Sequence, residues 1–271
     1  MAIPKLKRWQ LIAIVACCVG SMWYFLFPKN GDTADSFPNK VLLVMTSDET
    51  RDVVFAWPSF PVSVHVEGQP GSELLELVEE STSEISNIAG RQVMYHAGGD
   101  LAEIHVVLSV NDWSDFFKYY EGLFMRKYGA EEFIYWKGRG AFDFPIADEH
   151  PCFGFGITSP EKFSQAGYTR SNTPDFFLIG ILGASSRSSS DYMACLREEL
   201  SHALFFIPDY SVDSWQDSIF NSNATTPELT EFSDFDRDLV RFLANASLRH
   251  VNYEQLKNLA RKFSHNVPLE K

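Results

Sequence analysis

The sequence has no internal repeat, no low-complexity tract and no block of like charge. These absences argue against repeat architectures and against long disordered regions between the chain ends. Basic residues are also in the minority, with 23 Lys and Arg against 36 Asp and Glu and a formal net charge of -13. This balance disfavours nucleic acid and anionic lipid as partners of the part of the chain outside a membrane.

Cysteine is scarce, with four residues in a chain of 271. Cys17 and Cys18 lie in an apolar N-terminal segment, whereas Cys152 and Cys195 lie in the remainder. The second pair is compatible with one disulfide in an oxidising compartment or with two separate buried thiols, and the export signal described next favours the disulfide. Hydrophobic residues make up 45% of the chain and include 23 Phe, which is enough for the core of one sizeable domain.

The N-terminus has the pattern of a membrane anchor. Residues 1–8 contain three basic residues and no acid, and no charged residue occurs from Leu11 to Phe27. A helix of that length can just cross a bilayer, and the positive charge before it predicts a cytoplasmic N-terminus and an exported C-terminal domain. We therefore expect a signal anchor over residues 1–28, a linker over 29–40 and a single domain over 41–271. The protein would sit in the inner (cytoplasmic) membrane, with its domain in the periplasm or outside the cell.

Two other interpretations of this segment stay open. A cleaved signal peptide is one, although the small-residue cleavage pattern is weak and the apolar run continues past Gly20. A lipoprotein signal is the other, because residues 14–17 (Ile-Val-Ala-Cys) fit a lipobox. In that case the apolar stretch Val19 to Phe27 would follow the lipid directly. We favour the uncleaved anchor.

The first half of the domain alternates strand patterns with helix patterns. Apolar runs predict strands at Val41–Met45, Pro61–Glu67, Val93–His96, Glu103–Val110 and Glu132–Lys137. Helices are expected at Gly71–Ala89 and from Asn111 through Tyr128, each followed by a glycine. His65 falls on the polar side of its strand and is expected at the surface. The alternation predicts a sheet with helices packed on it.

The second half becomes largely helical. Strands are predicted at Cys152–Thr158 and Phe176–Leu182, and helices near 190–207, at Asp234–Asn245 and at Asn252–Phe263. The second of these strands is continuously apolar, as a strand buried on both faces should be. Ser190 or Asp191 is expected to cap the central helix, and Pro208 to stop it. The predicted fold class is α+β, a mixed sheet with helices around one central helix.

The central helix carries two different stripes of side chains. Cys195, Glu198, Glu199, His202 and Phe206 share one stripe at helical spacing. A separate apolar stripe should face the core, and it consists of Met193, Leu196, Leu200, Ala203, Leu204 and Ile207. The remaining face, with Arg197 and Ser201, is expected to meet solvent. Two stripes indicate a helix held between a core and a cleft.

The polar stripe contains the spacing Glu-Glu-x-x-His, which resembles the zinc-peptidase helix His-Glu-x-x-His with its first His replaced by Glu. Glu199 occupies the position of the catalytic general base, and His202 that of the second metal ligand. Glu198 occupies the position of the first ligand, and a carboxylate can bind zinc. Asp209, just past the helix end, is the candidate third ligand.

Several alternatives to this site also stay open. Less constrained third ligands are Asp213, His150 and His250, and an oxygen-rich set would accept Mn or Ca as well as Zn. In a simpler interpretation no metal binds: both glutamates are polar groups on the cleft side, and the histidine bonds one of them or a backbone carbonyl. The Ser-rich segment 185–190 lacks the flanking glycines of a nucleophile elbow.

Short motifs of the second half occur in an order that resembles a known family. They are Pro151-Cys152-Phe153, then Cys195-x-x-Glu-Glu-Leu-Ser-His-Ala-Leu with Asp209, then Ser218-Ile219-Phe220-Asn221, then Leu229-Thr230 with an acid near Asp236. This stretch, roughly Pro151 to Val251, resembles the bacterial domain-of-unknown-function family 2927. The resemblance implies a zincin-type fold behind a secretion or lipoprotein signal, with Glu199 as the zincin glutamate and paired cysteines at 152 and 195. It implies no assigned activity.

The chain departs from that family at two places. Phe205 stands where the family usually has Gly, and His250-Val251 stands where it has Gly-Met. We therefore expect a membrane-anchored, extracytoplasmic domain of unknown activity, without proven catalysis, that binds an envelope protein or cell-wall partner beside the central helix. The alternatives are a metal-dependent peptidase or amidase that uses Glu199 as base, and a purely structural envelope subunit. No nucleic-acid partner is expected.

Overall fold

The computed structural model describes residues 36–45, 57, 59–67, 72–99, 102–109, 112–138, 152–157, 174–182, 188–207, 218–220, 231–246, 248 and 251–266. The predicted anchor over residues 1–28 lies outside these ranges. Within them, no helix is both long enough and apolar enough to cross a membrane.

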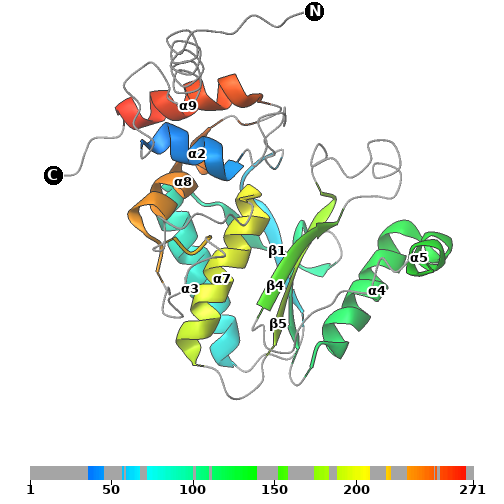
Figure 1. Ribbon diagram of the computed structural model, residues 1–271. Helices are drawn as coiled ribbons and strands as arrows, with labels where there is room; N and C mark the ends of the chain where they lie inside the picture. Colours follow the sequence, from blue (N-terminus) through cyan, green and yellow to red (C-terminus); the bar gives the residue numbers. More distant parts are fainter. Residues whose placement is uncertain are drawn as a thin grey trace, which may run out of the picture.

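A five-stranded mixed sheet lies at the centre of the fold (Figure 1). Its strands are β1 (Val62–Glu67), β2 (Met94–His96), β3 (Ile104–Ser109), β4 (Cys152–Ile157) and β5 (Phe176–Leu182). The spatial order is β2-β1-β3-β5-β4, in which β4 alone runs antiparallel to its neighbour. Among the described strands, β4 is therefore an edge strand that pairs only with β5.

Helices cover both faces of this sheet, which confirms the predicted α+β class. They are α2 (Phe37–Met45), α3 (Ser72–Ala89), α4 (Ser114–Tyr128), α5 (Ala130–Lys137), α7 (Ser189–Phe205), α8 (Asp234–Asn245) and α9 (Tyr253–Asn266). Figure 1 shows α3 and α7 on one face and α4 on the other. The chain thus forms three layers, with the central helix α7 packed on β4 and β5.

Strand β5 divides the core into two parts. Its residues are buried throughout, as its continuous apolar sequence predicts. Phe177, Ile179 and Ile181 join the core beneath α3 and α7, whereas alternate residues join the core beneath α4. Gly180 is needed there because a Cβ would lie 2.7 Å from the Phe116 ring of α4. Each face of the central strand is therefore packed against helices.

The predicted strand Val41–Met45 is wrong, because this run belongs to helix α2. Its apolar residues are buried at helical rather than alternating spacing, and α2 packs against α9. The Phe37 ring lies 5.4 Å from that of Phe263 and 5.9 Å from that of Phe242. Residues 37–40 of the predicted linker consequently belong to this helix.

The predicted strand Glu132–Lys137 is also wrong, because these residues form most of helix α5. Gly129, at φ 92°, ends α4 and starts α5 directly after it. Glu131 and Glu132 stand in the first turn, where negative charge favours a helix. The aromatic residues here suit a strand by propensity, but among the described strands none lies beside them to pair with.

His65 is half-buried, so the prediction of a simple surface position is wrong. Its Nε2 lies 3.0 Å from Glu67 Oε2, and its Nδ1 lies 3.3 Å from the carbonyl oxygen of Ala97. The segment after β2 therefore contacts the imidazole, and Gly99 N also lies 3.3 Å from His65 Nδ1.

Candidate functional site

Helix α7 carries the candidate site, and a capping box fixes its start. The hydroxyl of Ser188 accepts a hydrogen bond from the Asp191 backbone N–H at 3.3 Å, and Asp191 Oδ2 accepts from the Ser188 N–H at 3.0 Å. The cap is therefore Ser188, and the prediction of Ser190 or Asp191 is wrong by two or three positions. The hydroxyl of Tyr192 donates to the carbonyl oxygen of Leu182 at 2.8 Å, which ties the first turn to the end of β5.

A left-handed residue ends the helix before the proline that was predicted to stop it. Phe206 has φ 53°, and its N–H donates to the His202 carbonyl oxygen at 2.8 Å. A bulky residue in this conformation costs roughly 1–2 kcal/mol. Trp57 offsets part of that cost, since its ring packs 5.3 Å from the Phe206 ring and its indole N–H donates to the Ala203 carbonyl at 2.8 Å. Pro208 lies outside the described residues.

The predicted apolar stripe of α7 is confirmed, because all its residues are buried. The predicted solvent face is wrong, since α3 packs against it. Ser201 is fully buried, and its hydroxyl has no hydrogen-bond partner within the described part of the chain. Arg197 Nε lies 2.7 Å from Glu84 Oε2 of α3 in a half-buried ion pair. The helix is thus enclosed on a side that its sequence suggested was open.

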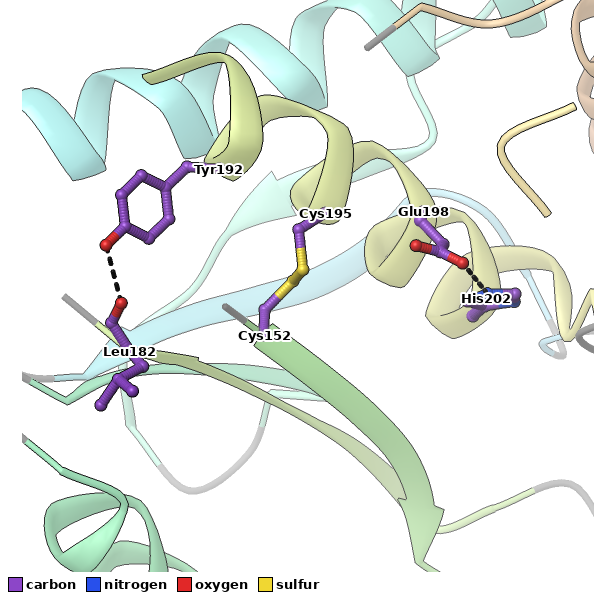
Figure 2. The surroundings of a disulfide bond; sticks show 6 residues. All are labelled: Cys152, Leu182, Tyr192, Cys195, Glu198 and His202. Carbon is purple, nitrogen blue, oxygen red and sulfur yellow. Dashed lines mark hydrogen bonds and ion pairs between the residues drawn. A yellow bond between two sulfur atoms is a disulfide. The ribbon is translucent and has the colours of Figure 1, made fainter. Parts of the chain in front are cut away.

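The disulfide between Cys152 and Cys195 joins the start of β4 to α7, with the two Cα atoms 6.1 Å apart (Figure 2). One helical turn beyond Cys195, the Glu199 carboxylate lies over Gly154, two residues along the strand. A Cβ on Gly154 would come within 2.5 Å of Glu199 Oε2. One turn of a helix and two residues of a strand both advance by about 5–7 Å. Cys195 can therefore face Cys152 while Glu199, one turn later, faces Gly154, two residues later. The general-base candidate therefore packs against the edge strand.

His202 and Glu198 face each other on the next part of the helix (Figure 2). His202 Nε2 lies 3.7 Å from Glu198 Oε1, at a spacing of four residues. His202 Nδ1 forms a short hydrogen bond with the carbonyl oxygen of Ile207, so this nitrogen carries a proton. The Phe220 ring packs 5.5 Å from the imidazole. The ring of His202 is thus held on two sides, with Nε2 directed at a carboxylate.

The geometry of this pair fits two metal ligands. Two donors at about 2.1 Å from a tetrahedral zinc lie about 3.4 Å apart, close to the observed separation. A metal-binding histidine also commonly donates its other N–H to a carbonyl, as His202 does. Within the described ranges, however, no group of three or more His, Cys, Asp or Glu side chains is placed to hold a metal. Asp209, His150, Asp213 and His250 lie outside those ranges.

A buried carboxylate lies beneath the site, at the start of α8. Asp236 is fully buried, and its Oδ1 accepts from the Ser218 hydroxyl at 2.5 Å. Its Oδ2 accepts from the backbone N–H groups of Ile219, at 3.2 Å, and of Ser233, at 3.0 Å. Burial raises the pKa of Asp236 above its usual range, against a lowering by these hydrogen bonds. The carboxylate thereby connects α8 to the turn that carries Phe220.

Sequence reasoning missed Gly154 and Phe220 as partners of the site, and it allowed for a backbone carbonyl bonded to the histidine without identifying it as that of Ile207. The alternation of Cys152 and Gly154 was a usable signal, because it places a residue without a side chain on the same face of β4 as the cysteine that bonds to α7. The contacts of His202 with Ile207 and Phe220 had no local signal. They depend on the left-handed turn at Phe206 and on packing between distant segments.

Comparison with known proteins adds little to this geometry. No protein-family model matches the chain, so the resemblance to domain-of-unknown-function family 2927 stays a prediction. No curated protein matches it either. Among solved structures, the crystal structure of myroilysin, a metallopeptidase, is similar at a TM-score of 0.38 and 11% sequence identity. The alignment covers 76% of this chain and 96% of that one.

Proposed function

We propose that this protein is a membrane-anchored, extracytoplasmic domain with a zincin-like fold that binds a protein or cell-wall partner beside helix α7, without catalysis. The observation that carries this proposal is the position of Glu199. Its carboxylate is half-buried and lies over Gly154 of β4, where the two elements approach too closely for a side chain at position 154. A general base instead needs a carboxylate directed at a reacting water.

The outer edge of strand β4 is the candidate binding surface for such a partner. Strand β4 pairs with β5 on one side, and the described part of the chain supplies no strand on its other side. An extended segment of a partner can add to an edge of this kind through backbone hydrogen bonds. The disulfide joins that edge strand covalently to α7.

The disulfide also supports the proposed location. Such bonds persist in oxidising compartments outside the cytoplasm. Protease added to intact spheroplasts should therefore digest a tag at the C-terminus and leave a tag at the N-terminus protected. Protection of both tags would contradict an exported domain.

Metal analysis and variants of the full-length protein test the absence of catalysis. After growth in zinc and purification in detergent, the protein should contain far less than one metal per chain. His202→Ala and Glu199→Gln should each restore the phenotype of a deletion strain as the wild type does. One bound metal per chain together with loss of complementation in both variants would overturn the proposal.

A photo-crosslinking residue tests the partner-binding surface. Placed in living cells at Glu198 on α7, whose side chain is 35% exposed, it should give one defined adduct with an envelope protein or with cell wall. The matched control is Ile134, which is exposed but lies on α5. Equal adducts at both positions, or none at Glu198, would contradict binding beside α7.

A metal-dependent peptidase or amidase is the second candidate, and the geometry of His202 favours it. Its Nδ1–H is held by the Ile207 carbonyl, which leaves Nε2 as the nitrogen that faces Glu198. A bound zinc would supply an activated water and polarise a carbonyl group. Glu198 and His202 would hold the ion with a ligand from outside the described residues, and Glu199 would accept the proton of that water. The metal analysis above separates the two candidates.

A further inference from the structure

The position of Phe220 depends on a short buried turn rather than on its own helix or strand. Ser218, Ile219 and Phe220 are all buried, and the Phe220 ring packs on His202 and, at 6.4 Å, on Phe232. The Phe220 N–H donates to the Ser218 hydroxyl oxygen at 3.3 Å, so the turn bonds within itself. It needs an external contact to fix it in relation to α7.

Asp236 provides that contact. One carboxylate oxygen accepts from the Ser218 hydroxyl, and the other accepts from the Ile219 N–H. The same carboxylate belongs to the capping box of α8, in which Ser233 Oγ accepts from the Asp236 N–H at 3.2 Å. A cap alone needs no fully buried acid, since Asp191 in the equivalent box of α7 is only half-buried. The buried carboxylate at α8 therefore does more than cap.

We propose that Asp236 is a positioning residue for the Glu198–His202 pair. Its carboxylate fixes the Ser218–Phe220 turn, and the turn places the Phe220 ring against the imidazole of His202. The ring then keeps the His202 Nδ1–H on the Ile207 carbonyl and Nε2 toward Glu198. This inference rests on the proposed function only through its second candidate, in which the pair holds a metal, and it concerns how the pair is positioned whether or not a metal binds.

Nuclear magnetic resonance of the full-length protein in detergent, with ¹⁵N-labelled histidine, tests the proposal without a partner or a metal. The readout is the Nδ1–H resonance of His202, which is assigned by its loss in His202→Gln. Asp236→Ala should increase the exchange of this proton with water by about tenfold or more, because the imidazole loses its fixed position. The matched control is Asp238→Ala, two residues along α8, where the carboxylate pairs with Arg241 at 3.2 Å instead.

Conservative variants distinguish positioning from a general loss of structure. Asp236→Asn should keep the resonance, since an amide can accept from the Ile219 N–H and donate to the Ser218 hydroxyl oxygen. Phe220→Leu keeps an apolar side chain but removes the ring, and it should shift the His202 ring protons and speed exchange. If Asp236→Ala does not fold, Ser218→Ala replaces it, with the same expected direction. The proposal would be overturned if the His202 signals were unchanged both in Phe220→Leu and in Asp236→Ala, or in Ser218→Ala where that variant replaces it.

Discussion

Glu199 Oε2 lies where the side chain of any larger residue at position 154 would begin, 2.5 Å from the ideal Cβ of Gly154. Gly154→Ala should therefore displace the Glu199 carboxylate. The added methyl group would also lie 2.8 Å from the Phe177 ring and 3.3 Å from the Leu178 carbonyl oxygen. We expect a loss of about 1–3 kcal/mol in the free energy of unfolding, measured by urea titration.

A double-mutant cycle isolates the contact with Glu199. In a Glu199→Ala background, the cost of Gly154→Ala should fall, because the nearest atom that the methyl group meets is gone. An equal cost in both backgrounds would show that Phe177 and the Leu178 carbonyl account for the whole effect.

The disulfide should contribute substantially to stability, because it closes a loop of 43 residues. Loop closure of this length predicts that Cys195→Ser lowers the free energy of unfolding by about 2–4 kcal/mol under oxidising conditions. Reductant should destabilise the wild type and leave the variant unaffected. Cys17→Ser, in the predicted anchor, serves as the control. Equal melting temperatures of oxidised and reduced wild type would contradict the prediction.

Ser201→Ala should leave stability unchanged or raise it by up to about 1 kcal/mol, because it removes a buried hydroxyl group without a hydrogen-bond partner in the described part of the chain. Ser81→Ala on the facing helix α3 is the comparison, since Ser81 is equally buried but its hydroxyl lies 3.5 Å from Met193 Sδ. Thermal unfolding of both variants gives the difference. A marked loss of stability in Ser201→Ala would indicate that its hydroxyl bonds to a group outside the described residues.

The buried Asp236 should make stability depend on pH. Its pKa is raised on folding, so its favourable contribution is complete below the unfolded pKa of about 3.9 and is lost as pH rises through the folded value. Asparagine does not titrate. The free energy of unfolding of the wild type, minus that of Asp236→Asn, should therefore fall between about pH 4 and neutrality. Urea titrations across this range measure it, and a difference that grows with pH would mean that the hydrogen bonds outweigh burial.

Hydrophobic periodicity predicted a helix or strand correctly where the apolar residues of the pattern are the residues that the fold buries. The continuous apolar run of β5 and the apolar stripe of α7 are examples, and Asp234–Asn245 is correct to the residue. Prediction failed for short apolar runs, at Val41–Met45 and Glu132–Lys137. Both runs are compatible with either element, and packing against α9 or the end of α4 decides between them.

The sequence by itself determined which chemical groups helix α7 presents, since the spacing of Cys195, Glu198, Glu199 and His202 follows from helix geometry alone. Only the tertiary structure decided what each group meets. Glu199 packs on Gly154, which lies 45 positions earlier in the chain. Arg197 pairs with Glu84 of α3, and His202 packs on Phe220. Such contacts join segments far apart in the chain, and local periodicity carries no information about which segments meet.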